Sequence, residues 1–254
     1  MSPEDPPGID RAYLAQFFHD RGVDEFAVVL PSSIHAPPGR GPVDVFPACR
    51  SVIVFGKRME DDLFCGPYRE SSRNVTLFKR RFNDTTDDLV RALRENGSDA
   101  VADRSVGVSN GTIRVALSFK HYAYDAGFGS IGNSTLLLSP RFGNRLALSV
   151  ILTDREFGPY PEVVPADDLC LRCGNCVHSC PENAIYPGSV DALRCRNVNG
   201  GIPGFLRPLL FRLFASDRAA PFLTPFVNRI AKTSVPRCSA CLISCPHFHK
   251  GEGR

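Results

Sequence analysis

The chain lacks several features that would place it in other classes of protein. It has no block of basic residues: 30 Lys and Arg face 27 Asp and Glu, giving a net charge of +3, so charge predicts no nucleic-acid partner. No apolar stretch reaches the roughly 20 residues of a transmembrane helix. The opening "MSPEDPPGID" has no basic n-region, apolar h-region or twin arginine, which predicts a cytoplasmic protein.

Cysteine, by contrast, is plentiful, with ten residues. Thiols stay reduced in the cytoplasm, so this number favours metal binding over disulfide bonds. Eight of the ten lie in the last third of the chain, from Cys170 onward.

Before that point, the sequence predicts alternating helices and strands. Asp10 is expected to cap the first helix, and the second is expected to break near Asn83. The pattern predicts an α/β sandwich. The expected helices are 11–22, 71–95 and 116–127, and the expected strands are 25–31, 51–56, 99–103, 135–140 and 145–154.

A change of composition near Phe157 predicts a domain boundary. The stretch "FGPYPEVVPADD" is rich in proline and precedes the cysteines. We therefore expect an α/β cofactor-binding domain over 1–156 and a small ferredoxin-like module over 157–254.

The cysteines of this module have a specific spacing. Cys170, Cys173, Cys176 and Cys180, followed by Pro181, match the bacterial ferredoxin pattern. A zinc site uses two pairs of ligands and would leave the middle cysteine unused. The spacing therefore predicts an iron–sulfur cluster.

A second group repeats the pattern with one ligand missing. Cys238, Cys241 and Cys245-Pro246 align with the last three positions of the first group, and Val235 stands at the fourth. Cys195 is the remaining cysteine of this half and supplies the replacement, so eight thiolates predict two [4Fe–4S] clusters. In ferredoxins the cysteine before proline ligates the other cluster, which assigns Cys170, Cys173, Cys176 and Cys245 to one cluster and Cys180, Cys195, Cys238 and Cys241 to the other.

Two cysteines lie outside the module. Cys49 opens an expected strand and is interpreted as a buried apolar residue. Cys65 is either another buried residue or a side chain facing a cofactor pocket.

The stretch "AGFGSIGNSTLLLSPRFGNRLALSVILTD", followed by the cysteine module, resembles the epoxyqueuosine reductase and reductive dehalogenase superfamily. That resemblance implies a nitroreductase-like α/β domain that binds cobalamin beside one cluster. A lone ligand between the two cysteine groups, here Cys195, is also a feature of the superfamily. The match is good over 117–250 and weak over 45–57.

The chain departs from that pattern in ways that bear on its substrate. Ser130 replaces the usual Trp, and Asn133-Ser134 replaces a Lys-Asn pair. Epoxyqueuosine reductases carry an acidic proton donor shortly before the glycine motif, which is 127–132 in this chain. Here 109–119 contains no carboxylate. Few residues follow Cys245, where those enzymes have a helical extension. We therefore expect neither a true epoxyqueuosine reductase nor a tRNA substrate, and the start lacks the export signal of membrane-linked dehalogenases.

The glycine motif is the expected cofactor-binding segment. Its glycines allow the backbone to approach a planar or phosphate-bearing ligand closely; a helix end followed by a tight turn is the alternative. The expected cofactor-binding residues are Gly127, Gly129, Ser130, Ile131, Gly132, Asn133 and Thr135.

A reductive cleavage needs a proton as well as electrons. Candidate donors lie in the expected helix before the glycine motif, where His121, Tyr124 and Asp125 share a face. Tyr122 is a further candidate, and the alternative for the tyrosines is packing in the core.

These inferences predict an iron–sulfur oxidoreductase. Electrons from an external donor of the ferredoxin or flavodoxin type would pass through the two clusters to bound cobalamin, which would cleave a small molecule reductively. The alternatives are an FMN-dependent reductase and an electron-transfer protein that reduces a corrinoid or flavin on a partner. The apolar, basic stretch 204–232 is expected to pack on the protein, form a homodimer contact or lie on a membrane surface.

Overall fold

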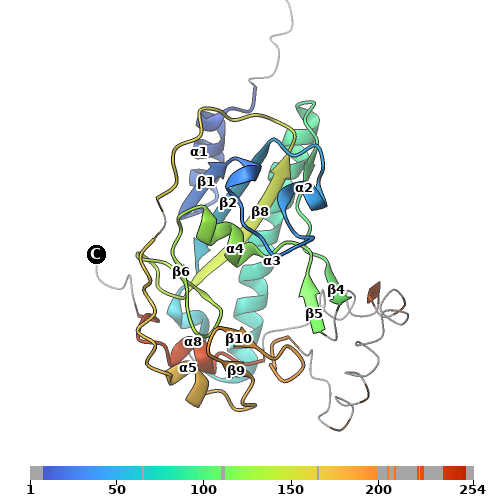
Figure 1. The fold of residues 1–254 in the computed structure, drawn as a ribbon. Coiled ribbons are helices and arrows are strands. Elements are labelled where there is room, and N and C mark those ends of the chain that lie inside the picture. Colours follow the sequence, from blue (N-terminus) through green and yellow to red (C-terminus); the bar gives the residue numbers. More distant parts are fainter. Residues whose placement is uncertain are drawn as a thin grey trace, which may run out of the picture.

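A four-stranded antiparallel sheet occupies the centre of the first part of the chain (Figure 1). The strands are β1 (Glu25–Val29), β2 (Ser51–Arg58), β8 (Leu146–Thr153) and β3 (Ala100–Val101), in the order β1-β2-β8-β3. In the computed structural model, the described residues are 8–64, 66–109, 112–164, 166–198, 205, 209, 222, 224–225 and 237–249.

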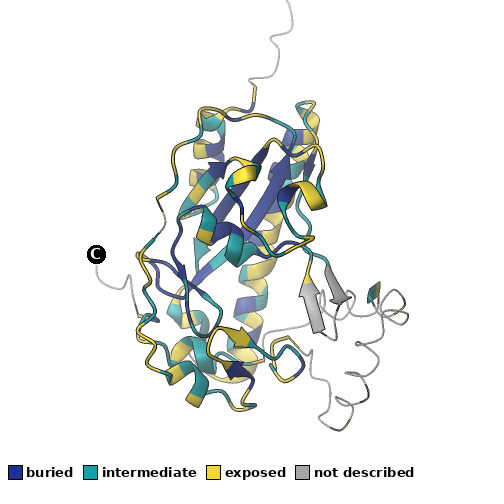
Figure 2. Cartoon of the chain, viewed as in Figure 1, coloured by how far each residue is buried: buried dark blue, intermediate teal, exposed yellow. Residues whose placement is uncertain are grey.

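Side chains alternate across the sheet, as the period of a strand requires. Along β2, Val52 and Val54 point into one apolar cluster, whereas Ile53 and Phe55 point into another. Figure 2 shows the central strands as the most deeply buried part of the molecule. Both faces of the sheet are therefore covered, and the core has two halves.

Two helices cover one face. Helix α1 (Arg11–Asp20) begins at Asp10, whose carboxylate accepts the Tyr13 N–H at 2.8 Å and caps the helix as predicted. Helix α3 (Tyr68–Glu95) packs beside it through Phe82, Leu89 and Leu93. Together these helices bury the Ile53 side of the sheet.

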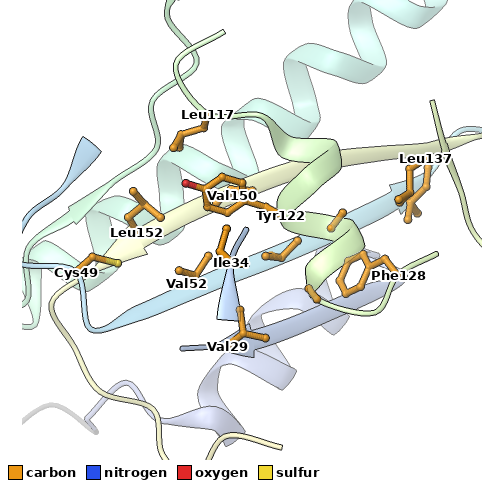
Figure 3. Packing of buried hydrophobic residues seen from close by; sticks show 14 of the residues in the cluster. Val29, Ile34, Cys49, Val52, Leu117, Tyr122, Phe128, Leu137, Val150 and Leu152 are labelled. Atoms are coloured by element: carbon orange, nitrogen blue, oxygen red, sulfur yellow. The ribbon is translucent and has the colours of Figure 1, made fainter. Parts of the chain in front are cut away.

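Helix α4 (Phe119–Asp125) covers the opposite face, as Figure 3 shows at close range. Tyr122 and Ala123 are fully buried against Val52, Val54 and β8. The result is a three-layered α/β sandwich, so the predicted fold class is correct at this level; the nitroreductase-like detail stays a prediction.

The break expected in the second helix is wrong. Helix α3 runs without interruption through Asn83. Asn83 is exposed, while Phe82 and Thr86 on either side of it are buried against the sheet. Tertiary packing of that apolar face outweighs the low helix propensity of one exposed asparagine.

The glycine motif forms strands rather than a turn alone. Ser130–Ile131 (β6) pairs with Leu137–Leu138 (β7), a shorter strand than the one expected over 135–140. A second hairpin joins β4 (Val106–Ser109) to β5 (Thr112–Val115) and was not predicted. The remaining short helices of this half are η1 (Pro31–Ser33), α2 (Pro42–Val45) and η2 (Asp61–Phe64).

Beyond β8 the chain runs along the sandwich to its far end (Figure 1). The elements of the cysteine-rich segment gather there: α5 (Asn175–His178), β9 (Ile185–Tyr186), β10 (Ser189–Val190) and α8 (Ala240–Ile243). Phe157 is still buried in the sandwich core, and the domain boundary at residue 156 stays a prediction.

Within the described residues, no helix combines the length and apolar character needed to cross a membrane. Most of 204–232 lies outside the described residues, so the interpretation of that stretch stays a prediction.

Candidate metal centre

The four predicted ligands Cys170, Cys173, Cys176 and Cys245, called here the first group and the ligands of the first cluster, line a single pocket. Cys170 and Cys173 come from the loop that leads into α5, Cys176 lies in α5 itself, and Cys245 comes from the turn after α8. The thiols are close enough to influence one another: burial, followed by the nearby Cys173, Cys176 and Cys170, raises the pKa of Cys245. The pocket's other lining residues are Gly132, Asn133, Ser134, Leu138, Leu171, Arg172, Gly174, Pro246 and His247.

The other four predicted ligands also lie close together. They are Cys180, Cys195, Cys238 and Cys241, called here the second group and the ligands of the second cluster. Burial, followed by the nearby thiols of Cys238, Cys195 and Cys180, raises the pKa of Cys241 to about 12. Cys176 of the first group contributes in the same direction. The two groups of four therefore lie next to one another.

Asn197 connects the backbone near Cys195 to the backbone at Cys238. Its side-chain oxygen accepts the N–H groups of Arg237 at 2.6 Å and Cys238 at 2.9 Å, and its amide nitrogen donates to the Cys238 carbonyl. Asn197 follows Cys195 by two residues, so these bonds bring Cys195 and Cys238 together across a long separation in sequence. Neither spacing nor composition singles out this asparagine.

Backbone amides point at the predicted ligand sulfurs. The Asn133 N–H lies 3.4 Å from Cys170 Sγ, and the Ala184 N–H lies 3.3 Å from Cys180 Sγ. Such bonds stabilise thiolates and tune the reduction potential of a cluster. The Asn133 contact also ties the end of the glycine motif to the first group.

This arrangement differs from a site for a single ion. Among the described residues, no three His, Cys, Asp or Glu side chains are placed to hold one metal ion, and the nine described cysteines are all free thiols. In a cubane cluster each thiolate binds a different iron, so the sulfurs surround the cluster rather than meet at one point. Four thiolates around one pocket, with amide donors, fit a cluster.

The glycines of the motif make their close approaches to the protein itself. Gly129 has φ +153°, and a Cβ there would lie 1.9 Å from the Leu138 carbonyl oxygen. A Cβ on Gly127 would press on Val163. A Cβ on Gly132 would likewise press on Leu138, at 3.1 Å, and would lie in ordinary contact with Cys170 Sγ at 3.7 Å, so this end of the motif is the part that lies nearest the candidate cluster.

The other predicted cofactor residues likewise fall into those that contact the protein and those that lie near the cysteine pocket. Ser130 is buried, and its hydroxyl accepts the Leu169 N–H at 2.9 Å, which fixes the residue before Cys170. Asn133 lines the pocket, Ile131 pairs with β7, and Thr135 adopts φ 60° in the connecting turn. Their role toward an organic cofactor stays a prediction.

The four candidate proton donors lie on α4, and none of the described residues lining the cysteine pocket comes from that helix. Tyr122 is fully buried, its hydroxyl donates to the Arg40 carbonyl at 2.7 Å, and burial raises its pKa strongly. The Asp125 carboxylate accepts the His35 N–H at 2.6 Å. Both contacts hold α4 to the loop before α2, which gives these two side chains structural roles.

The remaining two candidates are more accessible. Tyr124 is 39% exposed. His121 lies 2.6 Å from the Ser118 hydroxyl through Nδ1, and burial, followed by the charge of Lys120, lowers its pKa. Of the four, His121 and Tyr124 keep a group that a substrate can reach.

Cys49 is buried in the core beside Tyr122, as interpreted from the sequence (Figure 3). Its thiol donates to the Ser51 carbonyl, and burial raises its pKa to about 11. Cys65 lies outside the described residues, so both readings of it stay open.

Comparisons with known proteins support an iron–sulfur domain in this part of the chain; the assignment of single cysteines stays a prediction. Residues 163–186 match the family described as "4Fe-4S binding domain". An epoxyqueuosine reductase from Bacillus subtilis (strain 168) is 30% identical over 137 residues, which cover 54% of this chain and 30% of that enzyme. The match thus spans less than a third of the length of this curated relative.

Solved structures share the fold over most of the chain. An epoxyqueuosine reductase determined with an epoxyqueuosine-modified tRNA stem loop aligns with TM-score 0.55 and 16% identity, covering 96% of this chain and 66% of that one. A reductive dehalogenase described by a mechanism for B12-dependent dehalogenation aligns with TM-score 0.54 and 17% identity, covering 91% of this chain and 37% of that one. The resemblance to the epoxyqueuosine reductase and reductive dehalogenase superfamily that the sequence predicts is therefore confirmed.

Proposed function

We propose that this protein is an iron–sulfur oxidoreductase that carries electrons through two [4Fe–4S] clusters to a bound cobalamin for the reductive cleavage of a small molecule. The carrying observation is the gathering of Cys170, Cys173, Cys176 and the distant Cys245 around one pocket, with the second group of four beside it.

The residues present suit the clusters. The thiolates supply the ligands, the amides of Asn133 and Ala184 donate toward ligand sulfurs, and the adjacency of the groups suits electron transfer between them. Clusters of this kind supply one-electron transfer when bound. The protein sets their potential through burial and these hydrogen bonds.

Cobalamin is the organic cofactor that the resemblance favours. Support comes from the dehalogenase with a B12-dependent mechanism and from the end of the glycine motif, where Gly132 and Asn133 line the cysteine pocket. The Asn133 N–H keeps this backbone close to Cys170 Sγ, so a ligand held by Gly132–Ser134 would lie next to the first cluster. FMN is the alternative at the same place.

The proton for the cleavage would come from His121 or Tyr124. Tyr124→Phe and His121→Gln remove the acidic group with little change of shape. One of them is expected to lower turnover strongly without changing iron content, whereas Tyr122→Phe is the matched control and should leave turnover close to that of the wild type.

A small molecule is proposed as the substrate in place of tRNA, because 109–119 contains no carboxylate. The related enzyme solved with a tRNA stem loop makes this a necessary test. Product formation from an epoxyqueuosine-modified stem loop would refute the proposed substrate class.

The decisive experiment is anaerobic purification and reconstitution, followed by iron analysis and titration with cobalamin and with FMN. About eight irons per chain and a saturable absorbance change with cobalamin are expected. Binding of FMN alone would identify a flavin reductase. Binding of neither would favour an electron carrier that reduces a cofactor on a partner.

A further inference from the structure

Arg145 is a fully buried charged side chain, with 0% of its surface exposed. It stands directly before β8, far from the cysteines in sequence. Placing a guanidinium group in a protein interior is costly unless its N–H groups are paired. Its position therefore needs a reason that packing alone does not give.

The partners of Arg145 join two distant parts of the chain. Nε donates to the carbonyl of Phe248, and Nη1 donates to the carbonyl of Met59 at 3.0 Å. The guanidinium carbon lies 5.1 Å from the centre of the Phe248 ring, and Nη1 lies 3.9 Å from Asp61 Oδ1. Arg145 thus holds Phe248 against the end of β2.

The neighbouring Asn144 makes a second connection of the same kind. It is buried, and its amide nitrogen donates to the carbonyl of Leu242 in α8 at 2.8 Å. Leu242 directly follows Cys241, a predicted ligand of the second cluster, and lies three residues before Cys245. Phe248 lies three residues after Cys245. Two adjacent side chains of the sandwich therefore hold the backbone on both sides of one predicted ligand.

The held segment is short and has few other buried contacts. The described stretch 237–249 contains one turn of helix, and Phe248 is its buried apolar residue. The Phe248 N–H donates to the Cys245 carbonyl at 2.9 Å. Fixing Phe248 therefore also fixes the backbone of Cys245. A ligand that joins its cluster from 69 positions beyond Cys176 depends on such external support.

We propose that Asn144 and Arg145 are positioning residues that hold Cys245 at the first cluster: Arg145 acts through Phe248 on this cluster alone, and Asn144 acts through Leu242, which also borders Cys241 of the second cluster. This inference rests on the proposed function, because it assumes that Cys245 completes the cluster of Cys170, Cys173 and Cys176. Outer residues that orient metal ligands typically change metal affinity by about 10- to 100-fold when they are replaced.

The test uses the full chain, reconstituted anaerobically, with iron release to a chelator and the EPR spectrum of the reduced protein as readouts. Cys170→Ala and Cys195→Ala first identify the signal and the release phase of each cluster. Arg145→Met should accelerate release from the first cluster by about 10-fold or more. Arg145→Lys, which keeps the charge but loses the forked geometry, should give a smaller acceleration of the same phase.

Asn197→Ala is the matched control, because Asn197 makes the corresponding connection at the second group. It should accelerate release from the second cluster and leave the first unchanged. Equal acceleration of both phases by Arg145→Met and by Asn197→Ala would show a general loss of structure and overturn the inference.

Asn144→Ala keeps the inference testable if Arg145→Met does not fold. Acceleration of the first phase supports the positioning role, with or without acceleration of the second, because Leu242 also borders Cys241. Wild-type release in Asn144→Ala refutes it. Failure of the proposed two-cluster centre is visible separately, since wild-type protein would then hold about four irons and show one release phase before any substitution is made.

Discussion

The α/β sandwich and the cysteine-bearing segment achieve order by different physical means. In the sandwich, β2 presents six consecutive buried residues, Ser51 to Gly56, and two apolar clusters fill the space between sheet and helices. Beyond Phe157, the described buried apolar side chains are Ala184, Ile185, Leu193 and Phe248. We therefore expect apolar burial to stabilise the sandwich, and cluster ligation together with contacts to the sandwich to stabilise the segment.

The largest expected effect follows from removing the clusters. Metal binding and folding are coupled where ligands hold the structure, so chelated protein should lose the order of the cysteine-bearing segment and keep the sandwich. Limited proteolysis should then give cuts after Phe157 and leave a stable N-terminal fragment. Identical digestion patterns with and without iron would contradict the contrast between the two regions.

The next effect concerns half of the metal centre. Cys195→Ala should reduce the iron content from about eight to about four per chain, because each cluster holds four irons. Cys49→Ala, which removes a buried thiol outside the centre, is the control and should retain all the iron. Full iron in Cys195→Ala, with both EPR signals intact, would mean that another residue supplies the ligand.

A substitution in the sandwich core should lower the stability of the protein, whereas a substitution at an exposed position outside the core should not. Leu89 is fully buried on α3 against the sheet, and Leu89→Ala should lower the free energy of unfolding by about 2–5 kcal/mol. Val164→Ala, at a side chain 78% exposed, should change it by less than about 0.5 kcal/mol. Denaturant unfolding followed by circular dichroism measures both, and a larger loss in Val164→Ala would reverse the comparison.

The smallest effect is a pH dependence from Cys49. Burial raises its pKa from 9.0 to about 11, so folding favours the neutral thiol. Its contribution is complete below pH 9 and is lost as the pH rises toward 11. The difference in unfolding free energy between wild type and Cys49→Ala should therefore shrink over this interval, and a difference that grows with pH would show that the thiolate is the favoured form.

The sequence was informative where one local interaction determines the outcome. Asp10 caps α1 because its carboxylate has only to reach the next turn, and the apolar runs at β2 and β8 become strands because their period and composition agree. The cysteine spacing is equally local within 170–180, and the match to a 4Fe-4S binding domain covers this stretch.

Prediction failed where the deciding contacts lie far away in sequence. The continuity of α3 through Asn83 depends on the sheet beneath it. The need for glycine at position 129 comes from the close approach of the Leu138 backbone, which spacing does not reveal; its role toward a cofactor stays a prediction. Asn197 and Arg145 hold the ligand segments through backbone carbonyls and amides, and such partners leave no pattern in side-chain types.

The position of β8 in the sheet has a consequence for biosynthesis. As the last strand of the sheet to be translated, it lies between β2 and β3 and pairs with both, so the sheet cannot close until residue 153 has left the ribosome. At about 5–20 residues per second, Cys245 follows several seconds later. The nascent chain would therefore present a finished sandwich, with Arg145 in place, before the first cluster can receive its last ligand, and iron would be inserted after the scaffold is built.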